Sequence, residues 1–314
     1  MATAAPLQQG SDPTFRAYNS DQAKQYSEAR LAYPRELYDT ILRYHADSNG
    51  RFENLVDAGC GPGKATRELA PFFRQAIGAD PSEKMIQTAC QLGGTTAAGL
   101  PVRYHVSTAE ALCDLGDGSV LGRVDLLTAA TAAHWFDMPE FWSQAARLVR
   151  PGGTVALWTT GRFYCHPSTP NAATVNQIMA DLETEVLSPF ELPPNAVSRN
   201  LYDDLELPWS AETSSVETFP QSQFIRMAWD RDGELSDGKD FLGGSSTVSL
   251  ELLQEGYGTG STVTRWRAAH PDIAHTEADC VVQAIEKIRE AIGPEAGGTV
   301  RGGLSTGLLL FKRL

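Results

Sequence analysis

The hydrophobic positions of residues 53–158 follow two alternating periods. Short runs rich in apolar and β-branched residues predict buried strands, and between them apolar residues recur at the spacing of one helix face. The predicted strands are Asn54–Ala58, Ala76–Asp80, Val102–Ser107, Val124–Ala130 and Thr154–Trp158. Strands that alternate with helices are typical of a parallel sheet covered by helices on both faces. The pattern therefore predicts an α/β fold with a doubly wound, mostly parallel sheet.

Helical spacing of apolar residues covers residues 65–73, 85–90 and 141–149. The second of these helices is closed by Gly93-Gly94, and the third stops at Pro151, because proline cannot continue a helix. The alternation breaks after Trp158. Two further amphipathic helices are expected, from Val175 to Val186 and from Val281 to Ile292, before a closing strand at Thr306–Phe311.

These patterns divide the chain into five parts. We expect a flexible N-terminal tail (1–14), N-terminal helices (15–50), the α/β core (51–160), an inserted helical cap (161–300) and the closing strand of the core sheet (301–314).

Composition and charge exclude several classes of partner. The chain of 314 residues is 42% hydrophobic, which is enough for a full core, and its net charge of -13 argues against a surface that follows nucleic-acid phosphates. No secretory signal and no run of about 18 to 20 apolar residues is found, so no membrane partner is expected. The five cysteines are scattered without a CxxC pair, which predicts no metal site, no disulfide framework and a reduced, cytoplasmic chain.

Three alternating glycines, Gly59, Gly61 and Gly63, stand where the first strand is expected to turn into a helix. Glycine lets the backbone turn tightly and approach a ligand, and the helix N-terminus presents free N–H groups. A nicotinamide-binding loop would read G-x-G-x-x-G or G-x-G-x-x-A. The third position here is Lys64 in one register and Thr66 in the other, so a nicotinamide dehydrogenase is disfavoured.

Asp80 ends the second predicted strand, 17 positions after Gly63. A carboxylate at this edge of the sheet can accept hydrogen bonds from both hydroxyls of a ribose. The alternative is that Asp80 is only a helix N-cap ahead of Pro81.

The stretch that begins at Asp57 reads D-x-G-x-G-x-G and resembles motif I of the class I S-adenosylmethionine-dependent methyltransferases. The resemblance implies a Rossmann-like domain that binds S-adenosylmethionine through this loop, with Asp80 and Pro81 beside the ribose. Ala109 and Glu110 lie in a segment that resembles the adenine-edge segment of the family.

Met85 has two interpretations. It would cover the adenine face in a protein of this family, but its helical spacing also fits core packing.

The fourth predicted strand runs into small residues around Ala130, which leave room for a ligand, and then into His134-Trp135-Phe136. This segment is similar to that of trans-aconitate methyltransferase-like enzymes, including fungal small-molecule relatives. His134 either acts as a general base, or orients the methyl acceptor, or is a structural residue that fixes the loop.

Before the first strand, the segment from Tyr26 to Pro34 resembles a Tyr-x-x-x-Arg-Pro-x-Tyr-Pro segment of the same family, with Leu31 in place of the usual proline. The resemblance implies that the N-terminal helices form a lid over the cofactor. Tyr26 and Arg30 would then contact the methionyl group, Arg30 through its carboxylate. An ordinary amphipathic helix is the alternative.

The expected function is methyl transfer to a small molecule, with residues 51–160 binding the cofactor and 161–300 the acceptor. A carboxylic acid such as trans-aconitate and a secondary metabolite are both open as acceptors. The competing hypothesis is a catalytically inactive S-adenosylmethionine-binding or interaction protein on the same fold.

Overall fold

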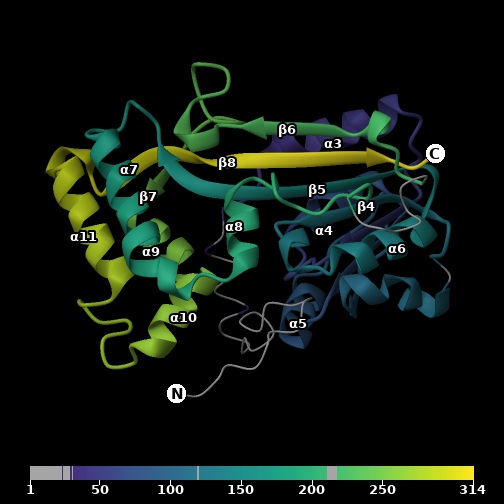
Figure 1. Cartoon of the computed structure of the whole chain (residues 1–314), viewed down its shortest axis with the longest axis horizontal. Coiled ribbons are helices and arrows are strands. Elements are labelled where there is room, and N and C mark those ends of the chain that lie inside the picture. Colours follow the sequence, from purple (N-terminus) through teal and green to yellow (C-terminus); the bar gives the residue numbers. More distant parts are fainter. Residues whose placement is uncertain (1–22, 24–28, 30, 119, 211–217) are drawn as a thin grey trace.

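The computed structural model describes residues 23, 29, 31–118, 120–210 and 218–314 (Figure 1). One sheet runs through the molecule in the strand order β3-β2-β1-β4-β5-β8-β6, and β7 pairs with the N-terminal part of β8. The strands are β1 Asn54–Ala58, β2 Gln75–Asp80, β3 Arg103–Val106, β4 Val124–Ala130, β5 Val149–Cys165, β6 Ile225–Trp229, β7 Ser246–Ser249 and β8 Thr299–Lys312. β1 to β5 pair in parallel, and β8 is antiparallel to its neighbours. The predicted mostly parallel α/β fold is confirmed.

Helices cover both faces of this sheet because its strands are apolar on both sides. Leu126 and Trp158 pack on one face with helices α3 (Arg35–Asp47) and α4 (Lys64–Leu69). Their sequence neighbours Leu127 and Leu157 pack on the opposite face, under α6 and the 3-10 segment η2. These two elements are Met138–Leu148 and Ala109–Gly118, and helix α5, Glu83–Leu92, packs beside β2 and β3. Successive strand residues point to opposite faces, so each strand joins two cores.

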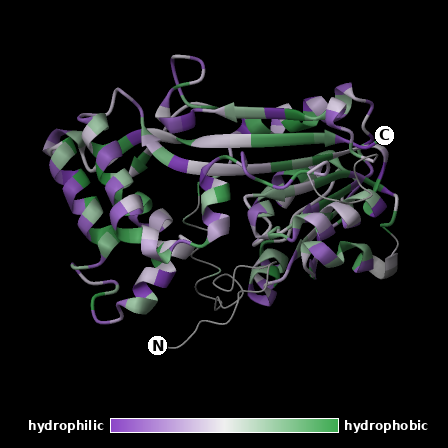
Figure 2. Cartoon of the chain, viewed as in Figure 1, coloured by the Kyte–Doolittle hydropathy of each residue, from purple (hydrophilic) through white to green (hydrophobic). Residues whose placement is uncertain are grey.

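Strands β5 and β8 are longer than the sequence predicted. Their pairing extends from Thr154 opposite Lys312 to Cys165 opposite Gly302, well past the other core strands. The C-terminal half of β8 is the strongly apolar half, green in Figure 2, whereas its N-terminal half is rich in glycine, serine and threonine. The apolar pattern revealed only the half of each strand that lies in the core.

The extended ends of β5 and β8 carry the cap (Figure 1). Its helices are α7 Ala172–Asp181, the π-helix η4 Leu182–Leu187, η5 Ser188–Phe190, α8 Pro193–Arg199, α9 Leu250–Gly258, α10 Ser261–Ala269 and α11 Cys280–Ile292. A second hydrophobic core joins these helices, α8 excepted, to Phe163 and Cys165 of β5 and Val300 of β8. Val197 of α8 packs instead against the core that contains α6. The expected cap segment 161–300 is therefore not only helical, because it also supplies β6 and β7 to the sheet.

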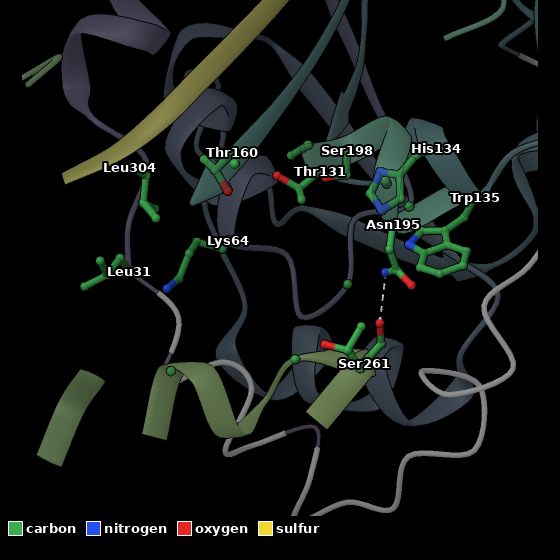
Figure 3. Close-up of a pocket in the computed structure, with 18 of the residues that line it drawn as sticks. Leu31, Lys64, Thr131, His134, Trp135, Thr160, Asn195, Ser198, Ser261 and Leu304 are labelled. Atoms are coloured by element: carbon green, nitrogen blue, oxygen red, sulfur yellow. Dashed lines mark hydrogen bonds between the residues drawn. The ribbon is translucent and has the colours of Figure 1, made fainter. Parts of the chain in front are cut away.

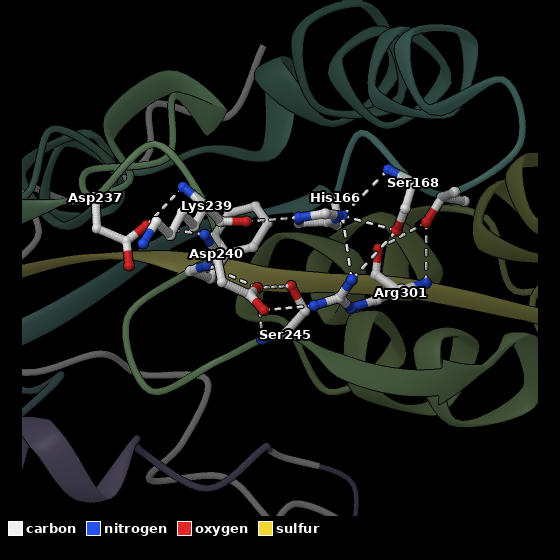
Figure 4. A network of polar contacts seen from close by, with 9 residues as sticks. His166, Ser168, Asp237, Lys239, Asp240, Ser245 and Arg301 are labelled. Atoms are coloured by element: carbon white, nitrogen blue, oxygen red, sulfur yellow. Dashed lines mark hydrogen bonds and ion pairs between the residues drawn. The ribbon is translucent and has the colours of Figure 1, made fainter.

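A polar network fixes the outer end of β8 (Figure 4). Arg301 of β8 forms an ion pair with Asp240, which lies in the connection between β6 and β7. His166, after β5, donates from Nε2 to the carbonyl oxygen of Lys239 at 2.9 Å, and its Nδ1 lies 2.7 Å from the hydroxyl of Ser168. The network joins three segments that are far apart in the sequence.

Within the described ranges, no helix combines the length and the apolar character needed to cross a lipid bilayer.

Candidate functional site

A cavity of about 400 Å³ opens where the carboxyl ends of the core strands meet the cap. Ligands of open α/β sheets bind in this crevice. Figure 3 shows Thr131, His134 and Thr160 reaching it from the strand ends, and Asn195 and Ser261 reaching it from the cap. Of the predicted site residues within the described ranges, these line the cavity: Gly59, Gly61, Asp80, Pro81, Met85, Ala109, Glu110, Ala130 and His134.

The glycine loop between β1 and α4 has left-handed backbone at all three glycines. A Cβ on Gly59 would lie 2.5 Å from the Cβ of Ala132, so this glycine allows the loop after β4 to pack closely. At Gly61, φ is +53°, and a Cβ would meet no atom of the described residues within 4 Å apart from its chain neighbours, because the backbone there faces open space. Gly63 is the N-cap of α4 and does not line the cavity. Gly61 is thus the point where a ligand can approach the backbone.

Asp57 lies beneath the loop and does not line the cavity. Its carboxylate accepts hydrogen bonds from the hydroxyls of Thr66 in α4, at 2.5 Å, and Thr128 in β4, at 2.7 Å. Burial raises its pKa to about 6, against the opposing effect of the two hydroxyl donors. As placed, Asp57 would act on a cofactor only by holding β1, α4 and β4 together. Direct contact stays a prediction.

Asp80 connects two loops at the cavity wall. Its Oδ2 accepts from the backbone N–H of Gly61 at 2.9 Å, and its Oδ1 accepts from the N–H of Ser82 at 2.8 Å. The helix-cap alternative for Asp80 is wrong, because the N-cap of α5 is Ser82, whose hydroxyl accepts from the N–H of Met85. The carboxylate therefore lies on the cavity side of the strand end, beside Pro81.

Glu110 has a structural contact as well as a cavity position. Its Oε1 accepts from the backbone N–H of Asp137 at 2.9 Å, and Asp137 caps α6. Glu110 therefore fixes the loop that contains the 3-10 turn η3, Ala133–Trp135. Met85 is almost fully buried yet lines the cavity, so both interpretations of this residue fit its position.

His134 lies in η3 with its Nδ1 3.3 Å from the hydroxyl of Tyr202. Withdrawal from water lowers the pKa of His134 to about 3, so its imidazole is neutral at pH 7. Tyr202 is fully buried, and it and Leu201 both have left-handed backbone, which is strained for such residues. No local pattern indicates that Tyr202 meets His134, because 68 residues separate them.

The cap wall carries two ion pairs that the sequence did not predict. Arg162 at the end of the core strand pairs with Glu183 of η4, and Arg199 of α8 makes a two-point contact with Glu191. All four side chains line the cavity. Burial raises the pKa of Glu183, although Arg162 opposes the shift.

Tyr26 and Arg30 lie outside the described residues. Two residues that follow them, Leu31 and Tyr33, line the cavity, and Tyr33 donates from its hydroxyl to Oγ1 of Thr131 at 3.0 Å. The lid role of Tyr26 and Arg30 stays a prediction.

Comparison with known proteins agrees with this geometry. Residues 56–157 match the family described as the methyltransferase domain. These residues form a methyltransferase domain. A candidate S-adenosylmethionine-dependent methyltransferase of Saccharomyces cerevisiae is 32% identical over 46% of this chain and 46% of its own length. A methyltransferase of Aspergillus candidus, cfoB, is 27% identical over 69% of this chain and 67% of its own.

The methyltransferase domain also has a structural counterpart. The solved structure of a candidate type II methyltransferase from Anaeromyxobacter dehalogenans superposes with a TM-score of 0.63 at 24% identity, covering 90% of this chain and 97% of that one. The fold is that of the class I methyltransferases, whose cofactor is S-adenosylmethionine. The matched stretch spans a little under half the length of the first curated relatives. The family match ends within β5 and does not extend into the cap.

Proposed function

We propose that this protein transfers the methyl group of S-adenosylmethionine to a small molecule bound against the cap. The observation that carries the proposal is one continuous cavity, lined on one side by the glycine loop and Asp80 and on the other by the cap helices. Methyl transfer is an in-line displacement that needs its two reactants aligned and shielded from water. A cavity between two packed layers provides both conditions.

The residues of the methyltransferase domain would hold the cofactor in three places. The open backbone at Gly61 allows close approach, and the carboxylate of Asp80 lies where ribose hydroxyls can donate to it. Ala109 and Glu110, with Met85 across the cavity, would enclose the adenine. Ala130 and the small residues after it leave room for the methionyl end, with Tyr26 and Arg30 as its proposed lid. When bound, S-adenosylmethionine supplies an activated methyl group on a sulfonium.

The acceptor is a carboxylic acid such as trans-aconitate, or a secondary metabolite with a hydroxyl or amine. These classes make different demands on the protein, because a carboxylate is already ionised at pH 7 whereas a hydroxyl or amine must lose a proton. His134 faces the cavity as a neutral imidazole and has one ring nitrogen near Tyr202. Two relatives from bacteria are named as ubiquinone biosynthesis O-methyltransferases, which favours a hydroxyl acceptor.

Calorimetric titration of the full chain with S-adenosylmethionine, S-adenosylhomocysteine and NAD tests the cofactor before any acceptor is known. We expect saturable binding of both adenosyl compounds and none of NAD. Transfer of labelled methyl groups is then measured over a set of acids, phenols and amines, beginning with trans-aconitate. Binding of NAD alone would refute the proposal, and tight adenosyl binding without transfer to any acceptor would favour an inactive binding protein.

A further inference from the structure

The cap half of the cavity holds its positive charges in ion pairs. Arg162 is paired with Glu183, and the exposed fractions of their side chains are 22% and 18%. Arg199 is paired with Glu191, with exposed fractions of 35% and 19%. Arg162 presents its Nε–H to Glu183, and Arg199 presents both of its Nη groups to Glu191. A ligand carboxylate at either arginine would therefore compete with a glutamate that is already bound there.

The charges of the whole cavity wall also disfavour a carboxylate ligand. Among the described residues that line it, the cations are Lys64, Arg162 and Arg199, and the carboxylates are Asp80, Glu110, Glu183 and Glu191. This wall has one more negative than positive charge, and the sulfonium of a bound cofactor brings it to balance. Carboxylates that enter this cavity lose hydration, and on its cap side both arginines already bind a glutamate; a tricarboxylate would bring three carboxylates.

The remaining groups of the cap wall are apolar or uncharged. The apolar side chains that line this part of the cavity are Leu187, Val248, Leu252, Leu253, Val263 and Leu304. The uncharged polar groups include Ser198, Asn195 and Ser261, and Asn195 donates to the hydroxyl of Ser261 at 3.2 Å (Figure 3). Such a wall fits a molecule with an apolar body and neutral hydrogen-bonding groups.

We propose that the acceptor is an uncharged molecule with an apolar body and a hydroxyl or phenol group, and that Glu183 and Glu191 exclude carboxylates by occupying the arginines. The inference rests on the proposed function. Transfer would form a bond from the acceptor oxygen to the methyl carbon while the sulfur–methyl bond breaks and sulfur keeps the electron pair. The neutral imidazole of His134 would accept a hydrogen bond from the hydroxyl and orient it, and the hydroxyl proton would pass to water.

Two probes that share an apolar propylphenyl body and differ in the charge of their polar group test this assignment. We would titrate 4-propylphenol and 4-propylbenzoate into the full chain saturated with S-adenosylhomocysteine at pH 7.5. Methyl transfer to each probe would be measured separately, with S-adenosylmethionine in place of S-adenosylhomocysteine. We expect the wild-type protein to bind the phenol at least about tenfold more tightly than the benzoate. Tighter binding of the benzoate, or binding of neither probe, would overturn the proposal.

Glu183→Gln and Glu191→Gln each release one arginine. We expect either variant to bind the benzoate about tenfold more tightly than the wild type does, with little change for the phenol. Glu185→Gln removes the same charge from an exposed position on η4 and should change neither affinity. Unchanged benzoate affinity in both test variants would overturn the proposal, and using two sites guards against one variant that fails to fold.

The same experiments separate this inference from the proposed function. A wild-type protein that binds S-adenosylmethionine and methylates carboxylates in preference to phenols would refute the acceptor class alone. A protein that binds no adenosyl compound would refute the function as well.

Discussion

The buried carboxylate of Asp57 gives a quantitative prediction about stability. Its pKa in the folded protein is about 6, against an ordinary value of 3.8, because it is removed from water. A pKa that is raised by folding means that the protonated form is the one favoured by the fold. The stability that Asp57 contributes is therefore fully present below about pH 4 and is lost as the pH rises through about 6.

The size of the loss follows from the shift. About two pH units at 1.36 kcal/mol each amount to at most ~3 kcal/mol of unfolding free energy between pH 4 and pH 7. Asp57→Asn removes the ionisation while keeping a group that can bond to the hydroxyls of Thr66 and Thr128. We expect the variant to be ~1–3 kcal/mol more stable than the wild type at pH 7.5, and similar to it at pH 4.

Urea unfolding of both proteins at half-unit intervals from pH 4 to 8 measures this difference. Thr128→Val is the matched control, since it keeps the carboxylate and removes one of its donors, and it should lower stability most at high pH. Because Asp57 does not line the cavity, the Asn variant should still bind S-adenosylmethionine. An Asn variant that is less stable than the wild type at pH 7.5, with the same pH dependence, would refute the reasoning.

Three further predictions concern the cavity. Asp80→Ala removes the acceptor of the Gly61 and Ser82 N–H groups and should weaken S-adenosylmethionine binding by at least about tenfold in calorimetry, whereas unchanged affinity would contradict the ribose assignment. Gly61→Val places a β-branched residue at a φ of +53° and should cost ~1–3 kcal/mol of stability together with cofactor affinity, both measured on the same preparation. The imidazole of His134 should show no protonation by NMR between about pH 8 and 5, and a midpoint near the ordinary value of about 6.5 would show that the ring is not withdrawn from water.

The core strands were predictable because each buried strand is a short run rich in apolar residues. β1 and β4 have the predicted bounds, and both lie in the middle of a parallel sheet where all but one residue of each strand is buried. β6 and β7 were not predicted, since β6 is only partly buried and β7 has four residues. Their assignment to the sheet depends on β8, which comes later in the chain and pairs with both.

The candidate site likewise contains residues that the sequence predicted and residues that it did not. The glycine loop and Asp80 were identified from the sequence because the loop is continuous and the carboxylate ends the next strand. The contact between Arg162 and Glu183 was not, because the two residues are 21 positions apart and lie on different elements. An arginine and a glutamate so far apart in the sequence form no local pattern. They meet because η4 and the end of β5 pack into the same hydrophobic core.

One local irregularity of the core sheet lies at Arg162, which lines the cavity. β5 contains one extra residue between Thr160 and Phe163 relative to β8, where Thr306 and Leu304 are the partners. A β-bulge of this kind bends the strand and turns its side chains out of the regular alternation. Gly161 lies in it, and a Cβ there would collide with the hydroxyl of Ser305. One continuous strand thus joins the two sides of the cavity, and its bulge contains Arg162. If the proposed function is correct, we expect acceptor selection to depend on the register of β5 and β8 as well as on the cap helices.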